Sequence, residues 1–304
     1  MKKLYNVILP LVAATTISCN PAEIPESPYS LETSTKFAKT IVENTPGYFG
    51  HIKSDEEYNI SQGVTLLNME YVNANGYAVR MMVYKVMLGG TATLAVTTPD
   101  DLNSIGTLQT ISEQAAALDK RDADYVLGAI NGDSFSASTG QPNGIVYRDG
   151  VGVKTTFSNA KGGFFAMLKD GSAGIFTQED FPSMKNSIVE ALGTTNQILL
   201  DGYALPQTDT SAAARTAVGV SEDGTCVYLV VVDGVYFFYS NGITTNDLAA
   251  VMKACGANNA ALLDAGDSTT LVRRNLQDEF EVFNSPFNNG LEKPVANGLA
   301  IVER

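Results

Sequence analysis

The sequence has 304 residues, 44% of them hydrophobic and 17% charged, as is usual for a soluble globular protein with one large core or two small ones. Its formal net charge of −13 argues against a general electrostatic attraction for nucleic acid or anionic lipid. An anionic substrate would therefore have to be bound by a few local donors.

Residues 1–19 predict a targeting segment that is removed from the mature protein. Two lysines precede an apolar stretch at 4–17, which is too short to span a bilayer. The segment ends at Cys19 in the manner of a bacterial lipoprotein signal, although Thr16 stands where such signals usually have leucine. We expect the lipid on Cys19 to be the only membrane contact and to hold the protein in the cell envelope, facing the periplasm or at the cell surface. Simple secretion is the second alternative.

Residues 20–58 are polar, contain several prolines and have weak periodicity, which predicts a tether and an N-terminal segment. A short helix is expected at 34–43. From residue 63 the pattern changes to strands separated by turns, so residues 59–304 are expected to form the main domain.

The first part of this domain predicts a hairpin, a strand, a helix and another strand. Asn75 and Gly76 separate two of the strands and are a strong hairpin signal. Thr110 and Glu113 form a capping-box pattern, and the apolar spacing after them predicts a helix that ends near Arg121. The strands are predicted at 64–69, 77–88, 93–98 and 125–130.

The second part of the domain predicts mainly strands. A helix is expected at 187–192, before Gly193. Another helix is capped by Thr244 and Asp247 and ends at Gly256. The strands are predicted at 163–168, 197–200, 215–220, 225–232, 260–263, 280–283 and 299–302.

Helices are few in this pattern, and many of the strands are joined as hairpins. Strand–helix–strand runs are predicted at 93–130 and 225–263. We therefore expect the α+β class, with mixed, hairpin-rich β-sheets and a few packed helices in a single main domain.

The scarcity of histidine and cysteine limits which metal sites, catalytic triads and disulfides the protein can form. His51 is the one histidine, so a metal site would need its other ligands from carboxylates. Gly-Asp-Ser occurs twice, but no histidine follows position 51 to act as the base for Ser134 or Ser268, which excludes a conventional serine hydrolase triad. An exported protein permits a disulfide between Cys226 and Cys255, and two buried thiols are the alternative.

Four apolar strands run directly into acidic or amide residues, and these strands end at Asp201, at Asp233, at Asp264 and at the run Asn131-Gly132-Asp133. The segment 264–270 also contains a second carboxylate, a glycine and three hydroxyls. Strand ends that deliver such groups into a crevice are where α/β proteins usually carry out their chemistry. A polar turn without a function is the alternative, because Asp-Gly and Asn-Gly are also common turn dipeptides.

Several stretches together resemble one family, the phosphodiester glycosidases. The matching stretches, in chain order, are AINGDSF, PNGIVYRDG, RTAVGVSEDGTCVYLVVVDG and GANNAALLDAGDSTTL. The resemblance covers roughly 63–302. Where the family usually has Asp-Gly-Gly-Gly-Ser, residues 264–268 read Asp-Ala-Gly-Asp-Ser, so Asp267 stands in the place of a glycine. The segment 131–135 is one residue longer than the usual Asn-Gly-Gly-Phe.

The resemblance implies hydrolysis of the bond between a sugar anomeric carbon and a phosphodiester oxygen, without an obligatory cofactor. The leaving group would be a phosphate monoester, whose second pKa is about 6, so it can depart near neutral pH with little protonation. Asp264 is expected to act as base or nucleophile and Asp133 as the second acid. The residues expected to bind substrate are Asn131, Arg215, Asp233, Gly266, Asp267, Ser268 and Thr269.

Two other functions remain open at this point. Four of the aspartates could hold a divalent cation such as Mg²⁺ or Ca²⁺ in a metal-dependent phosphodiesterase. The protein could also be a surface lipoprotein that binds glycans without turnover or scaffolds an envelope complex. As an enzyme, its expected partner is a phosphorylated glycan or another sugar-1-phosphodiester. The aspartates of the metal alternative are Asp133, Asp233, Asp264 and Asp267.

Overall fold

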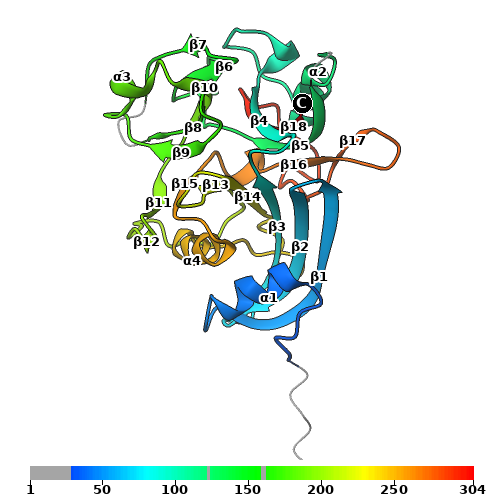
Figure 1. Cartoon of the computed structure of the whole chain (residues 1–304). Coiled ribbons are helices and arrows are strands. Elements are labelled where there is room, and N and C mark those ends of the chain that lie inside the picture. Colours follow the sequence, from blue (N-terminus) through cyan, green and yellow to red (C-terminus); the bar gives the residue numbers. More distant parts are fainter. Residues whose placement is uncertain (1–28, 122–123, 159–161) are drawn as a thin grey trace, which may run out of the picture.

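A computed structural model describes residues 29–121, 124–158 and 162–304 (Figure 1). The predicted targeting segment, Cys19 and the start of the tether lie outside the described residues. In the described part of the chain, no helix is both long and apolar enough to cross a membrane. The helices are α1 (Lys36–Glu43), α2 (Ile111–Leu118), α3 (Phe181–Met184) and α4 (Thr245–Cys255), with 3₁₀ turns η1 (Pro99–Asp101) and η2 (Gly266–Ser268).

The strands form three sheets. The eight-stranded sheet has the order β1-β2-β3-β14-β13-β15-β11-β12, and the two five-stranded sheets have the orders β17-β16-β5-β18-β4 and β7-β6-β10-β8-β9. The strand bounds are β1 (Phe49–Ser61), β2 (Val64–Asn73), β3 (Ala78–Met87), β4 (Ala92–Thr97), β5 (Tyr125–Asn131), β6 (Val146–Arg148), β7 (Val151–Lys154), β8 (Phe164–Leu168), β9 (Ala173–Phe176), β10 (Ile188–Gly193), β11 (Gln197–Leu200), β12 (Tyr203–Ala204), β13 (Arg215–Val220), β14 (Cys226–Val232), β15 (Asn259–Leu262), β16 (Leu271–Arg274), β17 (Phe280–Val282) and β18 (Gly298–Glu303).

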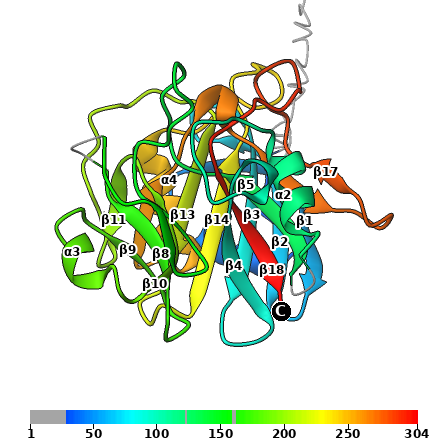
Figure 2. The ribbon, with the colours of Figure 1, turned by 90° about the horizontal axis from the view of Figure 1, so that it is seen from above.

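The eight-stranded sheet is buried on both faces, which explains why its central strands are continuously apolar. Alternate residues of β14 enter different cores, because successive side chains of a strand point to opposite faces. Tyr228 and Val230 join the core shared with α1 and α4. Leu229 and Val231 join the core shared with the two smaller sheets. Figure 1 shows α1 and α4 together at the lower end, and Figure 2 shows β8–β10 beside β4 and β18.

The α+β class predicted from the sequence is confirmed, but the sheets are not mixed, since every strand pair in the described residues is antiparallel. The reason lies in the two predicted strand–helix–strand runs. The strands β4 and β5 are joined through α2, yet β18 lies between them and is antiparallel to both. Likewise β13 lies between β14 and β15, which are joined through α4. In each run the two strands point the same way, so their carboxyl ends reach the same edge.

Local signals in the sequence were mostly confirmed. The hairpin at Asn75-Gly76 joins β2 to β3, and Gly76 has the positive φ of 84° that the turn requires. The capping box of Thr110 and Glu113 starts α2. Cys226 and Cys255 are buried free thiols. The predicted domain boundary at residue 59 falls inside β1, which pairs with β2.

The helix predicted at 187–192 is wrong, because this segment is β10. Its strand pairs with β6 and β8 and is mostly buried. Glu190, which fits a helix pattern by spacing, is 2% exposed and accepts 2.9 Å hydrogen bonds from the backbone N–H groups of Val96 and Asp149. These long-range bonds override a weak local helix preference.

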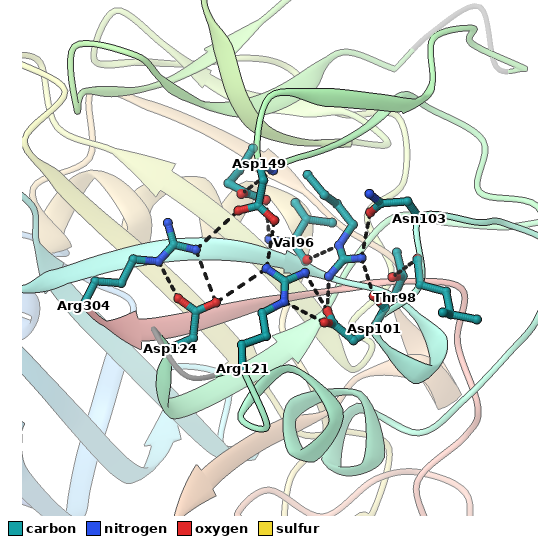
Figure 3. A network of polar contacts seen from close by, with 11 residues as sticks. Val96, Thr98, Asp101, Asn103, Arg121, Asp124, Asp149 and Arg304 are labelled. Atoms are coloured by element: carbon teal, nitrogen blue, oxygen red, sulfur yellow. Dashed lines mark hydrogen bonds and ion pairs between the residues drawn. The ribbon is translucent and has the colours of Figure 1, made fainter.

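A polar network joins the sheet that contains β6 and β10 to β4 and to the end of the chain (Figure 3). The guanidinium of Arg148, which is 1% exposed, donates to the backbone oxygens of Val96 (2.9 Å) and Asp101 (3.0 Å). Arg121 pairs with Asp101 at 2.6 Å and with Asp149 at 2.8 Å. The network therefore fixes the two five-stranded sheets against each other.

Candidate active site

Two of the strand ends that the sequence singles out, those after β5 and β15, meet where the eight-stranded sheet faces the sheet containing β5. Asp201 lies elsewhere, since it is exposed between β11 and β12 and its N–H donates to Asn259 at the other end of β15. The backbone N–H of Asp264 donates to the carbonyl of Gly132 at 2.9 Å, and that of Asn131 donates to Thr270 at 3.2 Å. The segments after β5 and after β15 therefore lie side by side. Each contains a Gly-Asp-Ser sequence, although 133 positions separate Asn131 from Asp264.

Asp133 is held in a tight, buried setting with 2% exposure. Its backbone N–H donates to Asn297 Oδ1 at 2.8 Å, and its carboxylate accepts the backbone N–H of Gly144 at 2.5 Å. A Cβ placed on Gly193 would lie 2.5 Å from Asp133 Oδ2, so only glycine fits there. The position and the rotamer of Asp133 are thus set by the Asn297 side chain and by backbone groups of other segments.

Burial, with a smaller contribution from the charge of Asp264, raises the pKa of Asp133, and the net pKa is about 6. The hydrogen bonds from Gly144 and Ser134 and the charge of Lys154 oppose this rise. Asp133 therefore holds a proton over much of the weakly acidic range. The backbone hydrogen bond from Asp264 to Gly132, the residue before Asp133, places the two predicted acids on adjacent segments.

Asp264 is only partly buried and so remains accessible from solvent. Burial raises the pKa of its carboxyl, while Ser268, the Ala265 N–H and the charge of Lys293 lower it. The Ser268 hydroxyl is near enough to affect this pKa, but it makes no hydrogen bond of ordinary geometry with any described residue. Asp264 is thus the more exposed of two acids whose pKa values are both raised.

Asn131 is fully buried, and its carboxamide is engaged by protein groups. Its Nδ2 donates to the Asp264 carbonyl at 2.8 Å. Its Oδ1 accepts from the hydroxyl of Thr216 at 2.7 Å and from the Thr270 N–H at 3.1 Å. The structure therefore gives Asn131 a role in positioning Asp264, which differs from the substrate contact predicted for it.

Asp233 is also buried, with 1% exposure. Its carboxylate accepts hydrogen bonds from Asn284 Nδ2 (2.9 Å), the Ser285 N–H (3.0 Å) and the Tyr239 hydroxyl (3.1 Å). Asn284 also donates to the carbonyl of Thr269 at 3.1 Å. Asp233 thus supports the loop that carries Thr269, and its oxygens are already occupied by protein donors.

The turn after Asp264 presents the remaining predicted groups. Gly266 has a φ of +67° with open space where a Cβ would be. Asp267 is half exposed and pairs with Lys293 at 2.8 Å. The hydroxyls of Ser268 and Thr269 are buried and have no hydrogen-bond partner among the described residues. Buried polar atoms are rarely left unpaired, so these two hydroxyls are well suited to a bound ligand.

Arg215 lies at the first position of β13, next to this turn. The backbone N–H of Gly266 donates to the carbonyl of Ala214, the preceding residue, at 3.2 Å. One guanidinium nitrogen pairs with the exposed Asp209 at 2.7 Å, whereas Nε is buried and without a partner among the described residues. The guanidinium of Arg215 is therefore held by Asp209, and its Nε–H remains available to donate a hydrogen bond.

Two residues that the sequence did not single out complete the site. Asn297 stands before β18, and its carboxamide holds the backbone of Asp133. Lys154 is largely buried and donates to the carbonyls of Gly144 (2.9 Å) and Thr156, which fixes the peptide that binds the Asp133 carboxylate. The Asn-Gly dipeptide at 297–298 was the available signal for the first, although Asn-Gly by itself usually indicates a turn.

The four aspartates of the metal alternative are not gathered into one donor set. Asp233 is bound by protein donors, and Asp267 pairs with a lysine. Among the residues that the structure describes, no three His, Cys, Asp or Glu side chains are grouped so that they could hold a metal ion. The site instead combines two carboxyl groups of unequal exposure, Asp133 and Asp264, with buried donors that have no hydrogen-bond partner among the described residues.

Comparisons with known proteins concern the family and the fold of the chain. A model of the phosphodiester glycosidase family matches residues 124–302, which is more than half of the chain. We found no significant match among curated protein sequences.

Solved structures share the fold. One is the pro-peptide-inhibited catalytic domain of zebrafish N-acetylglucosamine-1-phosphodiester alpha-N-acetylglucosaminidase, with a TM-score of 0.59, 21% identity, and coverage of 79% of this chain and 82% of that one. A hypothetical protein from Synechocystis has a TM-score of 0.59 and 14% identity over 82% of this chain and 64% of its own. A protein from Burkholderia pseudomallei has a TM-score of 0.50 and 14% identity over 74% of each chain.

Proposed function

Because the chain belongs to the phosphodiester glycosidase family, we propose that it hydrolyses the bond between a sugar anomeric carbon and a phosphodiester oxygen. The observation that carries this proposal is the pairing of Asp133 and Asp264. The two residues follow strands of different sheets, and the backbone N–H of Asp264 donates to the carbonyl of Gly132, the residue before Asp133. The charge of Asp264 also contributes to the raised pKa of Asp133. Most enzymes that hydrolyse glycosides use two carboxyl groups, one protonated and one ionised.

In the proposed reaction, water supplies a hydroxyl group to the anomeric carbon, and the bond from this carbon to the phosphate oxygen breaks. The products are a free sugar and a phosphate monoester. Asp264 is accessible and acts as the base or as the nucleophile. Asp133 is the second acid, because its raised pKa lets it keep a proton up to about pH 6. The leaving monoester needs little protonation, since its own second pKa is about 6.

The unpaired buried groups beside Asp264 would hold the substrate. The hydroxyls of Ser268 and Thr269 and the Nε of Arg215 have no partner among the described residues. A phosphodiester and sugar hydroxyls both offer oxygen acceptors to such donors. Asp267 adds a charge at the rim where the family usually has glycine, and Lys293 partly neutralises it.

Hydrolysis in water enriched in ¹⁸O tests the proposal and separates it from a phosphodiesterase. N-acetylglucosamine 1-phosphodiesters and glucose 1-phosphodiesters are suitable first substrates, the former because of the activity in the name of the zebrafish relative. We expect the label in the sugar product, since the bond to carbon is broken. Label in the phosphate product, with loss of activity in a chelator, would instead establish the metal-dependent phosphodiesterase.

Variants connect the activity to the site. Asp264→Asn and Asp133→Asn should lose turnover, whereas Glu222→Gln, a change at an exposed carboxylate, should not. Equal rates for Asp264→Asn and wild type would remove Asp264 from the mechanism. Saccharide binding without turnover in the wild type would favour the glycan-binding lipoprotein.

We also propose that the protein works in the bacterial cell envelope, attached through a lipid on Cys19. The support is the sequence of residues 1–19 described above. Metabolic labelling with a fatty acid, followed by membrane fractionation, tests this location. Wild type should carry the label in the membrane fraction, and Cys19→Ser should not. Unlabelled wild type in the soluble fraction would contradict lipid attachment.

A further inference from the structure

Two Asn-Gly dipeptides lie side by side at the candidate site. Asn131 is the last residue of β5 and is followed by Gly132, and Asn297 precedes Gly298, the first residue of β18. Asn131 is paired with Gly298 in the sheet register, and the Gly132 N–H donates to the carbonyl of Asn297 at 3.0 Å. A Cβ on Gly132 would lie 2.2 Å from Asn297 Oδ1, so glycine is required for this close approach.

Each of the two carboxamides holds the backbone of one of the two acids. Asn131 donates to the carbonyl of Asp264 at 2.8 Å. Asn297 accepts the N–H of Asp133 at 2.8 Å. The two bonds are complementary, since one asparagine acts through its nitrogen and the other through its oxygen.

The carboxamides of Asn131 and Asn297 differ in which of their atoms lack a hydrogen-bond partner. Asn131 uses its nitrogen once and its oxygen twice, all with protein groups. Asn297 uses only its oxygen, and its Nδ2 is buried without a partner among the described residues. The residue as a whole is 0% exposed.

The orientation of the Asn297 carboxamide follows from chemistry. The backbone N–H of Asp133 is a donor and requires an oxygen opposite it. A flipped carboxamide would set two donors against each other, so the NH₂ group must be on the other side. A buried NH₂ group can only donate, and an unpaired one is costly. The group therefore requires an acceptor that the described protein does not supply.

We propose that Asn297 binds substrate directly: Nδ2 donates a hydrogen bond to a substrate oxygen while Oδ1 positions Asp133. This inference rests on the proposed function, because it places the substrate between Asp133 and the turn that follows Asp264. The acceptor is an oxygen of the phosphoryl group or of the sugar. The same residue thus links substrate binding to the alignment of the second acid.

Nuclear magnetic resonance of the side-chain amides tests the contact without requiring turnover. The Asn297 NH₂ signals can be assigned as those missing from the spectrum of Asn297→Asp. The probes are inorganic phosphate, N-acetylglucosamine and N-acetylglucosamine 1-phosphate. We expect one Asn297 proton to shift downfield with the probe that carries the acceptor, and the signals of Asn131, already bonded to Asp264, to shift much less.

The probes separate the two acceptors. A shift with inorganic phosphate assigns the phosphoryl oxygen, and a shift with N-acetylglucosamine but not with phosphate assigns the sugar. If no probe shifts the Asn297 signals, the inference is overturned. If the signals shift but no sugar-1-phosphodiester is hydrolysed, the binding role stands and the proposed function fails.

Kinetics then separate substrate binding from a purely structural role. Asn297→Asp keeps an oxygen for the Asp133 N–H and replaces the donor by an acceptor. We expect KM to rise about tenfold, as for one lost hydrogen bond to a charged group. The melting temperature should also fall, because Asn297 is 0% exposed and a carboxyl at this position is buried next to Asp133. Asn288→Asp, the same change at an exposed position, should leave both unchanged. Wild-type KM in Asn297→Asp, together with a lower melting temperature in Asn297→Ala, would reduce Asn297 to a structural residue.

Discussion

The carboxamide nitrogen of Asn131 donates a 2.8 Å hydrogen bond to the backbone carbonyl of Asp264, so the last residue of β5 holds the segment after β15. The bond joins the two sheets at the point where β5 is followed by Asp133 and β15 by Asp264. Because Asn131 is buried and its oxygen accepts two further bonds, the position of Asp264 depends on a saturated network.

Removing the Asn131 side chain should therefore destabilise the fold. Asn131→Ala leaves the Thr216 hydroxyl, the Thr270 N–H and the Asp264 carbonyl without their partner. We expect the free energy of unfolding to fall by about 3 kcal/mol. Urea denaturation measures this, with Asn288→Ala as an exposed control. A loss as small as that of the control would show that water satisfies these groups.

Replacing Asp264 should abolish turnover while preserving the fold. General acid–base catalysis by a positioned side chain contributes about 10²–10⁴-fold, so Asp264→Asn should lower kcat by at least about 10². Burial raises the pKa of this carboxyl, so the neutral amide should not destabilise the protein. Initial rates and thermal unfolding of the same samples test both statements. A decrease in kcat that only matches a loss of folded protein would contradict the catalytic role.

The pH dependence of the rate should have two limbs. Asp264 works as an anion, and its raised pKa places the acid limb above the usual range for aspartate. Asp133 works with its proton, which it loses as the pH rises through about 6, so the rate should fall above that pH. A profile of kcat between pH 4 and 9 tests this. Asp133→Asn should lower the rate and remove the alkaline limb, and an unchanged limb would assign it to another group.

The same carboxyl should affect stability in a defined direction. The folded pKa of Asp133 is about 6, above its ordinary value of 3.8, so the folded state binds more protons between these values. Its contribution to stability is fully present below pH 3.8 and is lost as the pH rises through about 6. Asp133→Asn should flatten this part of the stability curve. Chemical denaturation at a series of pH values gives the comparison, and equal slopes in both proteins would contradict the assignment.

Changing Asp267 to glycine should alter substrate affinity more than stability. Its ion pair with Lys293 is half exposed, and such pairs contribute only about 0.2–1 kcal/mol. Removing the negative charge beside the site should lower KM for an anionic phosphodiester by about twofold to fivefold. The effect should shrink at high salt. Measuring KM at two ionic strengths tests this, and a salt-independent change would point to a steric cause.

Within the network in Figure 3, the buried Arg148 should contribute more to stability than the exposed ion pairs do. Arg148 is 1% exposed, and removing one partner of a buried ion pair costs about 3–5 kcal/mol. Arg148→Ala should therefore lower the free energy of unfolding by about that amount. Asp149→Asn, which affects a half-exposed pair with Arg121, should cost less than about 1 kcal/mol. Equal losses in denaturation experiments would contradict a special role for the buried arginine.

The sequence by itself determined most of the local structure of this protein, with the exception of β10. Hairpins formed where Asn-Gly and Asp-Gly separate apolar strands, a capping box began α2, and an N-cap threonine began α4. Such signals act within a few residues, through backbone sterics and short-range hydrogen bonds. Apolar strands that run into polar residues also indicated the site segments at 131–135 and 264–270.

The tertiary structure alone decided which strands became neighbours and what each acid then contacts. The insertion of β18 between β4 and β5 made the sheet antiparallel and brought Asn297 to Asp133, 164 positions earlier in the chain. Asp233 has the same strand-end pattern as Asp264, yet Asn284 and Ser285 occupy its carboxylate. These outcomes depend on packing and on hydrogen-bond partners from distant segments, and local propensity carries no information about such partners.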